Sequence, residues 1–188
     1  MATDAIVAAA REWLGTPYVH QASVKGAGCD CLGLLRGIWR ELNGDEPEDP
    51  PPYSPDWAET KGEETLYLAL SRHLREIGTA SLAPGDIALF RMNPRGPAKH
   101  CGIVAEKNGM QTLIHARQNK RVSEEAFGAF WRKRLAYGFR LELTSPSLGG
   151  RSAARASGGG PMLVASTALH PELSLLRFET SGLPTRGR

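Results

Sequence analysis

Cys31 is the residue of this sequence whose type and position best suit covalent chemistry. It follows Asp30 and opens a run in which apolar residues recur with helical spacing as far as Leu42. Aspartate is a common helix N-cap, because its carboxylate accepts the free backbone N–H groups of the first turn, so we predict that a helix begins at or near Cys31. A cysteine in the first turn lies at the positive end of the helix dipole, which favours the nucleophilic thiolate form.

A cysteine nucleophile requires a base, and two histidines of a predicted hairpin suit that role. Asn108-Gly109 is a dipeptide typical of a two-residue hairpin turn. Such a turn sets the register of the flanking strands, so that His115 faces Gly102 and His100 lies diagonally opposite on the same face. Diagonal neighbours are about 7–8 Å apart at the backbone, which lets one imidazole reach the other. The sequence therefore predicts that one histidine is the base for Cys31 and that the other orients it.

Length and composition indicate one ordinary globular domain with some additional chain. The chain has 188 residues, of which 41% are hydrophobic and 23% are charged. Its formal net charge of +3 comes from the residues after Gly150, and the residues before them carry equal numbers of acidic and basic side chains. This distribution argues against nucleic acid as a partner. No apolar stretch has the length of a membrane span and the N-terminal residues lack a signal-peptide pattern, so neither a membrane partner nor Sec-dependent export is expected.

The hydrophobic pattern predicts an α+β fold. Helices are predicted at residues 3–14, 31–42 and 63–77, strands at 87–90, 100–106, 110–116 and 136–143, and a short helix or turn at 123–134. We expect N-terminal helices, with the Cys31 helix packed on an antiparallel sheet of roughly five strands. Residues 1–144 are predicted to form this domain, with 45–80 as an insertion. Residues 145–188 are interpreted as a Gly-, Ser- and Arg-rich linker and C-terminal tail.

The start of the insertion, residues 45–62, is acidic and rich in proline, so no regular structure is expected there. It also carries two aromatic residues, Tyr53 and Trp57. The segment is either a surface loop held down by these two rings or a wall of a substrate cleft, and the sequence leaves both interpretations open.

Several short motifs in a fixed order resemble those of one enzyme family. They are Gly15-Thr16-Pro17-Tyr18, Asp30-Cys31-Leu32-Gly33-Leu34, Pro84-Gly85-Asp86-Ile87, His100-Cys101-Gly102-Ile103-Val104 and Ile114-His115-Ala116. Together they resemble the NlpC-type cell-wall peptidases, which are papain-like cysteine peptidases, over roughly residues 3–143. The resemblance implies a papain-like α+β fold and hydrolysis of peptidoglycan stem peptides.

The resemblance also implies a role for each matching residue. Cys31 corresponds to the nucleophile, His100 to the base and His115 to the orienting third member. Tyr18 and Asp30 correspond to residues that line the substrate site, with Tyr18 near the oxyanion. The bond implied is the amide between D-glutamate and a diamino acid, cleaved through an acyl-enzyme, with the Cys31 backbone N–H holding the tetrahedral intermediate. The resemblance implies neither a cofactor nor a metal.

In its acidic insertion and its lack of a signal-peptide pattern, the sequence resembles the phage-associated branch of that family. This branch includes peptidases that are encoded among the tail genes of phages and phage-like gene-transfer particles. The expected partners are therefore peptidoglycan and, through the C-terminal tail, proteins of a phage-like tail or baseplate. The protein is expected to be made in the cytoplasm, to be incorporated in such a particle and to act on the periplasmic cell wall.

Other interpretations remain open. One is a structural tail protein that uses the fold for binding, and another is an amidase or acyltransferase on the same scaffold. A zinc site of Cys29, Cys31, His100 and Cys101 has suitable ligand types, although its spacing matches no known module. Leu32 and Cys101 also depart from the family pattern, in which a small residue usually follows the nucleophile and an aliphatic residue usually follows the base.

Overall fold

A computed structural model of the chain describes residues 2–53 and 63–143. The chain divides into two units, Met1–Leu148 and Gly149–Arg188, and the second unit lies outside the described residues. The predicted C-terminal tail and Trp57 therefore lie outside them as well. The helices are α1 (Ala2–Glu12), α2 (Cys31–Asn43), α3 (Thr65–His73) and α4 (Ala129–Arg132), with a 3-10 turn η1 (Thr79–Ser81). The strands are β1 (Ser23–Val24), β2 (Gly28–Cys29), β3 (Arg75–Ile77), β4 (Ile87–Phe90), β5 (His100–Lys107), β6 (Met110–His115), β7 (Ser123–Ala126) and β8 (Leu135–Arg140).

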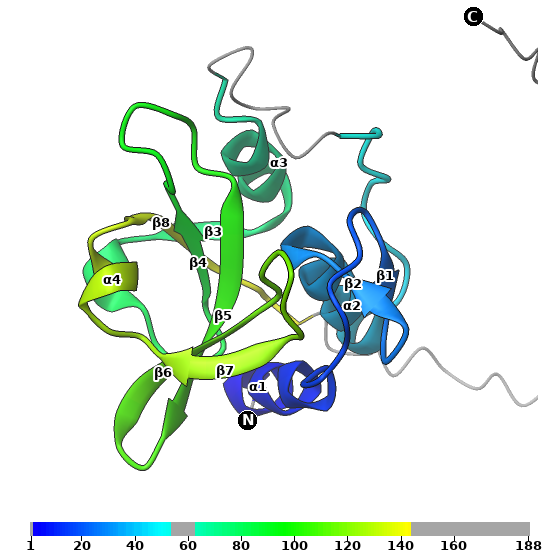
Figure 1. The fold of residues 1–188 in the computed structure, drawn as a ribbon, viewed down its shortest axis with the longest axis horizontal. Helices are drawn as coiled ribbons and strands as arrows, with labels where there is room; N and C mark the ends of the chain where they lie inside the picture. The colour runs from blue at the N-terminus through cyan, green and yellow to red at the C-terminus, as the bar shows by residue number, and fades with distance from the viewer. Residues whose placement is uncertain (1, 54–62, 144–188) are drawn as a thin grey trace, which may run out of the picture. The chain divides into compact units, whose positions relative to one another are not determined.

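The fold is α+β, as predicted, and its main sheet is antiparallel with six strands in the order β3-β8-β4-β5-β6-β7 (Figure 1). The predicted helix at 63–77 is confirmed as α3, and the predicted short helix or turn at 123–134 contains α4. The ends of these segments that form the edge strands β3 and β7 were wrongly predicted. Their sequences, Arg-Glu-Ile and Ser-Glu-Glu-Ala, carry no alternating apolar pattern. Pairing with β8 and β6 makes them strands, because strand preference depends on neighbouring strands more than on the segment itself.

The β5–β6 hairpin has the predicted register. Lys107 pairs with Met110, and the ladder continues from there without a slip. The two residues of the Asn108-Gly109 turn have φ values of 53° and 73°, as a type I′ turn requires. A Cβ atom on Gly102 would lie 3.0 Å from the Cβ atom of His115. The glycine therefore leaves the room that His115 occupies beside β5.

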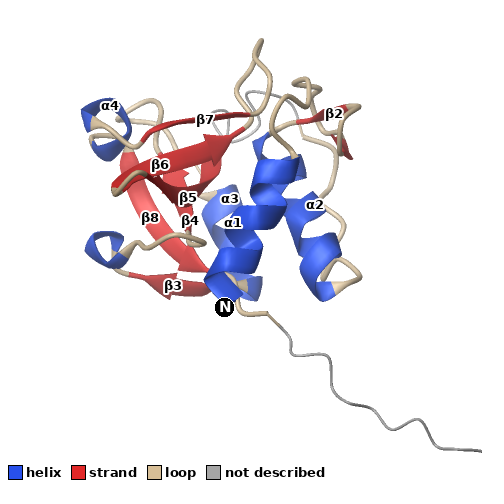
Figure 2. Ribbon diagram, turned by 90° about the horizontal axis from the view of Figure 1, so that it is seen from below, coloured by secondary structure: helices blue, strands red, loops and turns tan. Residues whose placement is uncertain are grey.

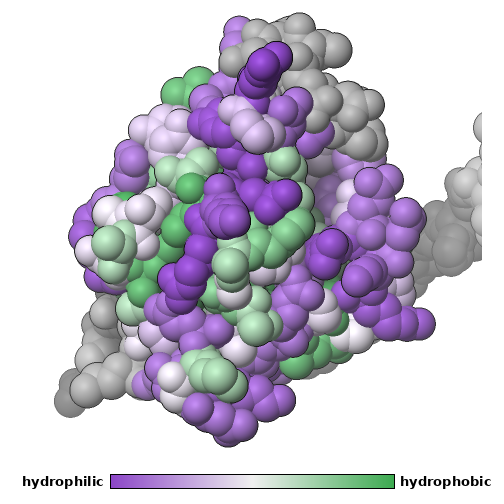
Figure 3. All heavy atoms as spheres, turned by 60° about the vertical axis from the view of Figure 1, so that its left-hand side comes forward, coloured by the Kyte–Doolittle hydropathy of each residue, from purple (hydrophilic) through white to green (hydrophobic). Residues whose placement is uncertain are grey.

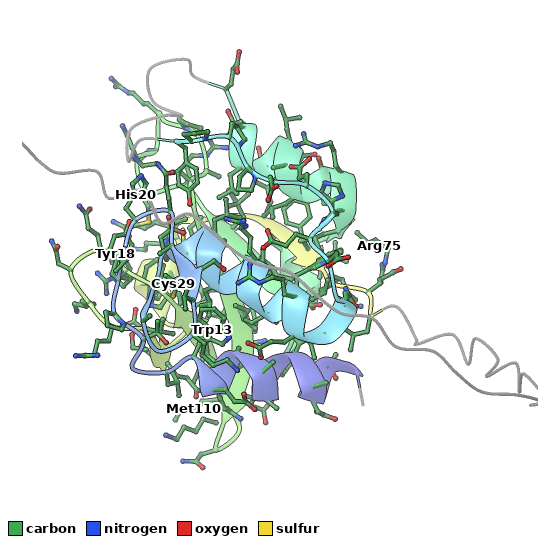
Figure 4. The ribbon with its side chains drawn as sticks, turned by 90° about the vertical axis from the view of Figure 1, so that its right-hand side faces the viewer. Trp13, Tyr18, His20, Cys29, Arg75 and Met110 are labelled. Carbon is green, nitrogen blue, oxygen red and sulfur yellow. The ribbon has the colours of Figure 1, made fainter. Side chains whose placement is uncertain are left out.

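Helices cover both faces of the main sheet (Figure 2). On one face α1, α2 and α3 pack over a large hydrophobic cluster, and on the other a smaller cluster lies under α4. Trp13 follows α1 and lies against α2, where a side chain at Gly37 would overlap its indole ring (Figure 4). Successive side chains of β5 point to opposite faces of the sheet. Cys101 therefore points to the face covered by α2, and His100 points to the face covered by α4.

The side of the molecule on which α4 lies has a mostly polar surface (Figure 3). Figure 3 shows this side of the molecule, where hydrophilic side chains surround smaller groups of hydrophobic ones. Phe130 is 48% exposed, and the guanidinium of Arg134 lies 3.7 Å from the centre of its ring. No described helix is long and apolar enough to cross a membrane.

Candidate active site

Cys31 begins α2, as predicted, and Asp30 caps the helix. The Oδ1 atom of Asp30 accepts a hydrogen bond of 2.8 Å from the backbone N–H of Gly33. The Cys31 side chain is half-buried, with its Sγ atom 4.0 Å from the carbonyl oxygen of Lys99. Lys99 precedes His100, so the start of α2 lies beside the start of β5. The N–H groups of a helix's first turn have no acceptor within the helix, which leaves that of Cys31 suited to hold a developing negative charge.

The two histidines of the predicted site are in direct contact. The Nε2 atom of His100 lies 2.9 Å from the Nδ1 atom of His115. His115 is completely buried, whereas His100 is half-buried. His115 occupies the Nε2 atom of His100, which leaves the Nδ1 atom of His100 for Cys31. His100 forms a hydrogen bond with Cys31. Trp131, on α4, packs against both rings at centroid distances of 5.4 and 4.8 Å.

Several contacts favour the thiolate of Cys31. A hydrogen bond with the Cys101 thiol is the main cause that holds the pKa of Cys31 well below its ordinary value. Burial acts in the opposite direction, and a hydrogen bond and the positive charge of His100 lower the pKa further. The same contact with Cys31, together with burial, raises the pKa of Cys101, which therefore stays a protonated donor.

Cys101 is thus a site residue whose effect on Cys31 was not predicted from the sequence, where it is a departure from the family pattern and a candidate zinc ligand. Its Sγ atom lies 3.3 Å from the carbonyl oxygen of Cys31, and an S–H group rotates freely enough to turn from that oxygen to the neighbouring thiolate. Strand alternation was the signal that placed residue 101 towards the Cys31 helix. Trp131 had no comparable signal, because its contact with the histidines depends on how α4 packs on the sheet.

His115 is neutral at ordinary pH. Burial is the largest cause that lowers its pKa, to about 3, and the positive charges of His100, Arg117 and Lys120 lower it further. A neutral imidazole has one N–H donor and one bare nitrogen acceptor. His115 can therefore accept a hydrogen bond from His100 and orient that ring.

Tyr18 lies close to Asp30 and Cys31, and its role towards a substrate stays a prediction. It forms a β-bridge with Cys29, which places it beside the strand that leads into α2 (Figure 4). Burial, followed by the negative charges of Asp30 and Cys31, raises the pKa of Tyr18 to about 12. The hydroxyl is therefore a hydrogen-bond donor at any physiological pH.

Asp30 lies at the site too, but protein donors occupy its carboxylate. It is 2% exposed and accepts hydrogen bonds from Gly33, from the backbone N–H of Gln21 at 2.7 Å and from the Tyr53 hydroxyl at 2.6 Å. Its role towards a substrate stays a prediction, because the hydrogen bonds that it makes in this structure hold the backbone around Cys31 in place.

The first part of the insertion borders the site through Tyr53. The ring of His20 lies edge-on to the Tyr53 ring at 5.1 Å, and its Nε2 atom lies 2.7 Å from the Tyr53 carbonyl oxygen. The insertion also covers an apolar pocket between α2 and α3, which is lined by Leu32 and by prolines 47 and 50. Leu32 therefore lines this pocket, where the insertion packs on α2.

The thiols show no metal-binding arrangement. In residues 2–53 and 63–143 no group of three or more His, Cys, Asp or Glu side chains is placed to hold a metal ion. Cys29, Cys31 and Cys101 are free thiols. Burial and the nearby charges of Asp30 and Cys31 raise the pKa of Cys29 to about 12, so Cys29 is not a second nucleophile.

Solved structures share the fold of this chain. No protein-family model matches the chain, and no curated protein matches its sequence. The NlpC/p60 domain of the peptidoglycan hydrolase SagA is 22% identical, with a TM-score of 0.52, over 74% of this chain and 98% of that one. NlpC2 from Trichomonas vaginalis is 21% identical, with a TM-score of 0.52, over 77% of this chain and 47% of that one. An NlpC/P60 family protein from Bacillus cereus is 19% identical, with a TM-score of 0.53, over 77% of this chain and 41% of that one.

The chain therefore matches nearly the whole SagA domain but less than half of the other two proteins. At identities this low the likeness concerns the arrangement of helices and strands. This chain has the papain-like fold of NlpC/P60 domains.

Proposed function

We propose that this protein is a cysteine peptidase that hydrolyses the stem peptides of peptidoglycan, with Cys31 as the nucleophile, His100 as the base and His115 as the residue that orients the base. The observation that carries the proposal is the contact of Cys31 with His100, whose Nε2 atom lies 2.9 Å from the buried His115. This set occurs in a fold shared with the NlpC/p60 domain of a peptidoglycan hydrolase, which supports the substrate class.

The mechanism follows from the chemistry of these groups. The Cys31 thiolate attacks the carbonyl carbon, and the Cys31 backbone N–H stabilises the oxyanion of the tetrahedral intermediate. The protonated His100 then gives its Nδ1 proton to the leaving amine, which leaves a thioester on Cys31. A water molecule, deprotonated by His100, attacks the thioester and releases the acid product. None of these steps needs a metal or a cofactor.

The bond that we propose is the amide between D-glutamate and the diamino acid of the stem peptide. Support for it comes from the motif resemblance, in which Tyr18 and Asp30 line the substrate site. Tyr18 has the chemistry for this role, since its raised pKa keeps the hydroxyl a donor. Asp30 contributes by fixing the backbone that carries Cys31.

The test is mass spectrometry of diaminopimelate-type peptidoglycan after incubation with the wild-type protein, with Cys31→Ala and with the near-isosteric Cys31→Ser. We expect fragments cut after D-glutamate from the wild type alone. Cuts that persist in Cys31→Ala would overturn the assignment of the nucleophile. Products joined to an added amine would indicate an acyltransferase, and an inactive wild type with normal folding would favour a binding protein.

We also propose that the protein is a component of a phage-like tail that opens the cell wall for the particle. The support is the resemblance of the insertion to the tail-associated branch. The test is mass spectrometry of particles purified from producing cells on a density gradient. Co-purification with tail proteins is expected, whereas full recovery in the soluble fraction would contradict the tail role and leave the peptidase proposal intact.

A further inference from the structure

We propose that Glu125, on β7, is a positioning residue that sets the proton arrangement of the two histidines, so that the Nδ1 atom of His100 is available to take the proton of Cys31. The proposal rests on the proposed function for its role in a reaction. The proton arrangement itself is a property of the folded protein and can be measured without any substrate.

His100, His115 and Glu125 lie on three adjacent strands of the main sheet, β5, β6 and β7. His115 pairs with Ser123, and Leu113 pairs with Glu125, so Glu125 is the diagonal neighbour of His115 on the same face. His100 stands in the same diagonal relation to His115 from the other side, on β5. The stagger of the strands therefore extends the line from Cys31 through both histidines to Glu125.

The contacts of Glu125 support this role. Its Oε1 atom lies 3.1 Å from the Nε2 atom of His115 and accepts a hydrogen bond of 2.7 Å from the indole N–H of Trp131. The Nε2 atom of His115 is buried and has no well-aligned hydrogen-bond acceptor within residues 2–53 and 63–143. The contact with Glu125 is therefore bent but close, and it brings a negative charge to the nitrogen that needs an acceptor.

The tautomer of His115 decides whether His100 can act as a base. For the Nδ1 atom of His100 to be bare, its proton must reside on Nε2 and be donated to the Nδ1 atom of His115. His115 must then carry its own proton on Nε2, next to the Glu125 carboxylate. With the opposite tautomer of His115 the hydrogen bond reverses, the proton of His100 moves to Nδ1, and that atom faces Cys31 without a lone pair. Glu125 selects the first arrangement because its oxygen attracts the Nε2 proton.

The surrounding charges oppose protonation of His115, so the role that we propose for Glu125 concerns the position of its proton and not its charge. His100 on β5, with Arg117 and Lys120 in the loop after β6, presents positive charge to His115. The guanidinium of Arg117 also lies 3.5 Å from the Oε1 atom of Glu125. These cations oppose protonation of His115, which stays neutral while the carboxylate fixes its tautomer. An asparagine or glutamine in place of His115 would need no such partner, because its amide oxygen can only accept the hydrogen bond from His100.

The first measurement is the tautomer itself, from the side-chain nitrogen chemical shifts of ¹⁵N-histidine-labelled protein. In the wild type we expect His115 to carry its proton on Nε2. In Glu125→Ala we expect a shift towards the Nδ1 tautomer, and in Glu125→Gln we expect recovery, because the amide oxygen also accepts a hydrogen bond. A wild-type His115 with its proton on Nδ1 would overturn the proposal whether or not any variant folds.

The second measurement is the rate at which iodoacetamide alkylates Cys31 as a function of pH, read by peptide mass spectrometry. The matched control is Glu124→Ala, because Glu124 adjoins Glu125 on β7 but contacts Arg11 and Thr112 instead of the histidines. We expect Glu125→Ala to raise the apparent pKa of Cys31 by about one unit and to slow alkylation by up to about tenfold at pH values below that pKa. Glu124→Ala and Glu125→Gln should behave like the wild type.

An unchanged pH profile in a folded Glu125→Ala would overturn the proposal. An equal change in Glu124→Ala would overturn it as well, because it would show that any loss on β7 has the same effect. A protein that shows the expected tautomer and profile but cleaves no peptidoglycan would contradict the proposed function and leave this inference standing.

Discussion

The two sides of the site each contain a carboxylate, and the two carboxylates differ in what they contact. On the helix side Asp30 is 2% exposed and accepts hydrogen bonds from two backbone N–H groups and from the Tyr53 hydroxyl. On the sheet side the Glu125 side chain is 34% exposed and its Oε1 atom contacts Trp131 and His115. Asp30 therefore holds backbone in place, whereas Glu125 contacts the side chains of Trp131 and His115.

The two sides of the site therefore have different roles in the proposed reactivity of Cys31. The helix side fixes where the sulfur lies, and the sheet side fixes which nitrogen carries a proton. Substitutions on the helix side should therefore lower the free energy of unfolding, whereas those on the sheet side should lower reactivity while leaving the fold intact.

The largest effect is expected on the sheet side, from His100→Ala. Loss of the base should lower kcat/KM for stem-peptide cleavage by about 1,000-fold, within the range typical of general-base removal. The midpoint of thermal unfolding should change little, because His100 is half-buried at the start of a strand. Cleavage assays and thermal scans of the same preparation provide the comparison. A variant that keeps a tenth of the wild-type activity would contradict the assignment of the base.

Asp30→Ala tests the helix side. The substitution removes an N-cap and leaves the N–H of Gln21 and the hydroxyl of Tyr53 without their acceptor. We expect the free energy of unfolding to fall by about 3 kcal/mol, as measured by urea denaturation. Glu125→Gln is the matched control and should change it by less than about 1 kcal/mol. Equal losses in the two variants would remove the distinction between the two sides.

The pH dependence of stability tests the burial of neutral His115. Its pKa is about 3 in the folded protein against 6.5 ordinarily. Above pH 6.5 the side chain is neutral in both states. Between these values the unfolded chain binds a proton that the folded protein does not, so stability is lost as the pH falls. From pH 6.5 to pH 5 this loss is about 2 kcal/mol.

His115→Asn should remove that part of the pH dependence, since asparagine does not titrate. The measurement is the urea midpoint of the variant and of the wild type at pH 7 and at pH 5. The carboxylates that also titrate in acid are common to both proteins and cancel in the difference. Parallel losses in the two proteins would show that His115 is not buried in its neutral form.

The smallest effect is expected from Cys101→Ala. This variant tests whether a residue on the helix side also affects the reactivity of Cys31. Cys101 faces α2, yet its thiol lowers the pKa of Cys31, so it is a helix-side residue that affects reactivity. We expect up to about a tenfold slower alkylation of Cys31 at pH 6. Cys101→Ser keeps a hydrogen-bond donor and should retain most of the wild-type rate. Equal rates in the wild type and in Cys101→Ala would show that the Cys101 thiol does not stabilise the thiolate.

Local signals were sufficient for the parts of the site that neighbouring residues define. The start of α2 follows from Asp30 and Cys31, because an N-cap acts within one helical turn. The contact of His100 with His115 follows from the Asn108-Gly109 turn, because a tight turn fixes the register of both strands.

Tertiary structure decided the parts that depend on contacts distant in sequence. The sequence around Glu125 carries no strand pattern, and β7 exists because β6 pairs with it. Trp131 reaches the histidines through the packing of α4, and Tyr53 reaches Asp30 from the insertion. The sequence by itself determined that Cys31 begins a helix and that His100 lies beside His115, because cap and turn preferences are local. Only the folded sheet brought the carboxylate of Glu125 next to His115, because the pairing of a strand depends on the whole surface that it meets.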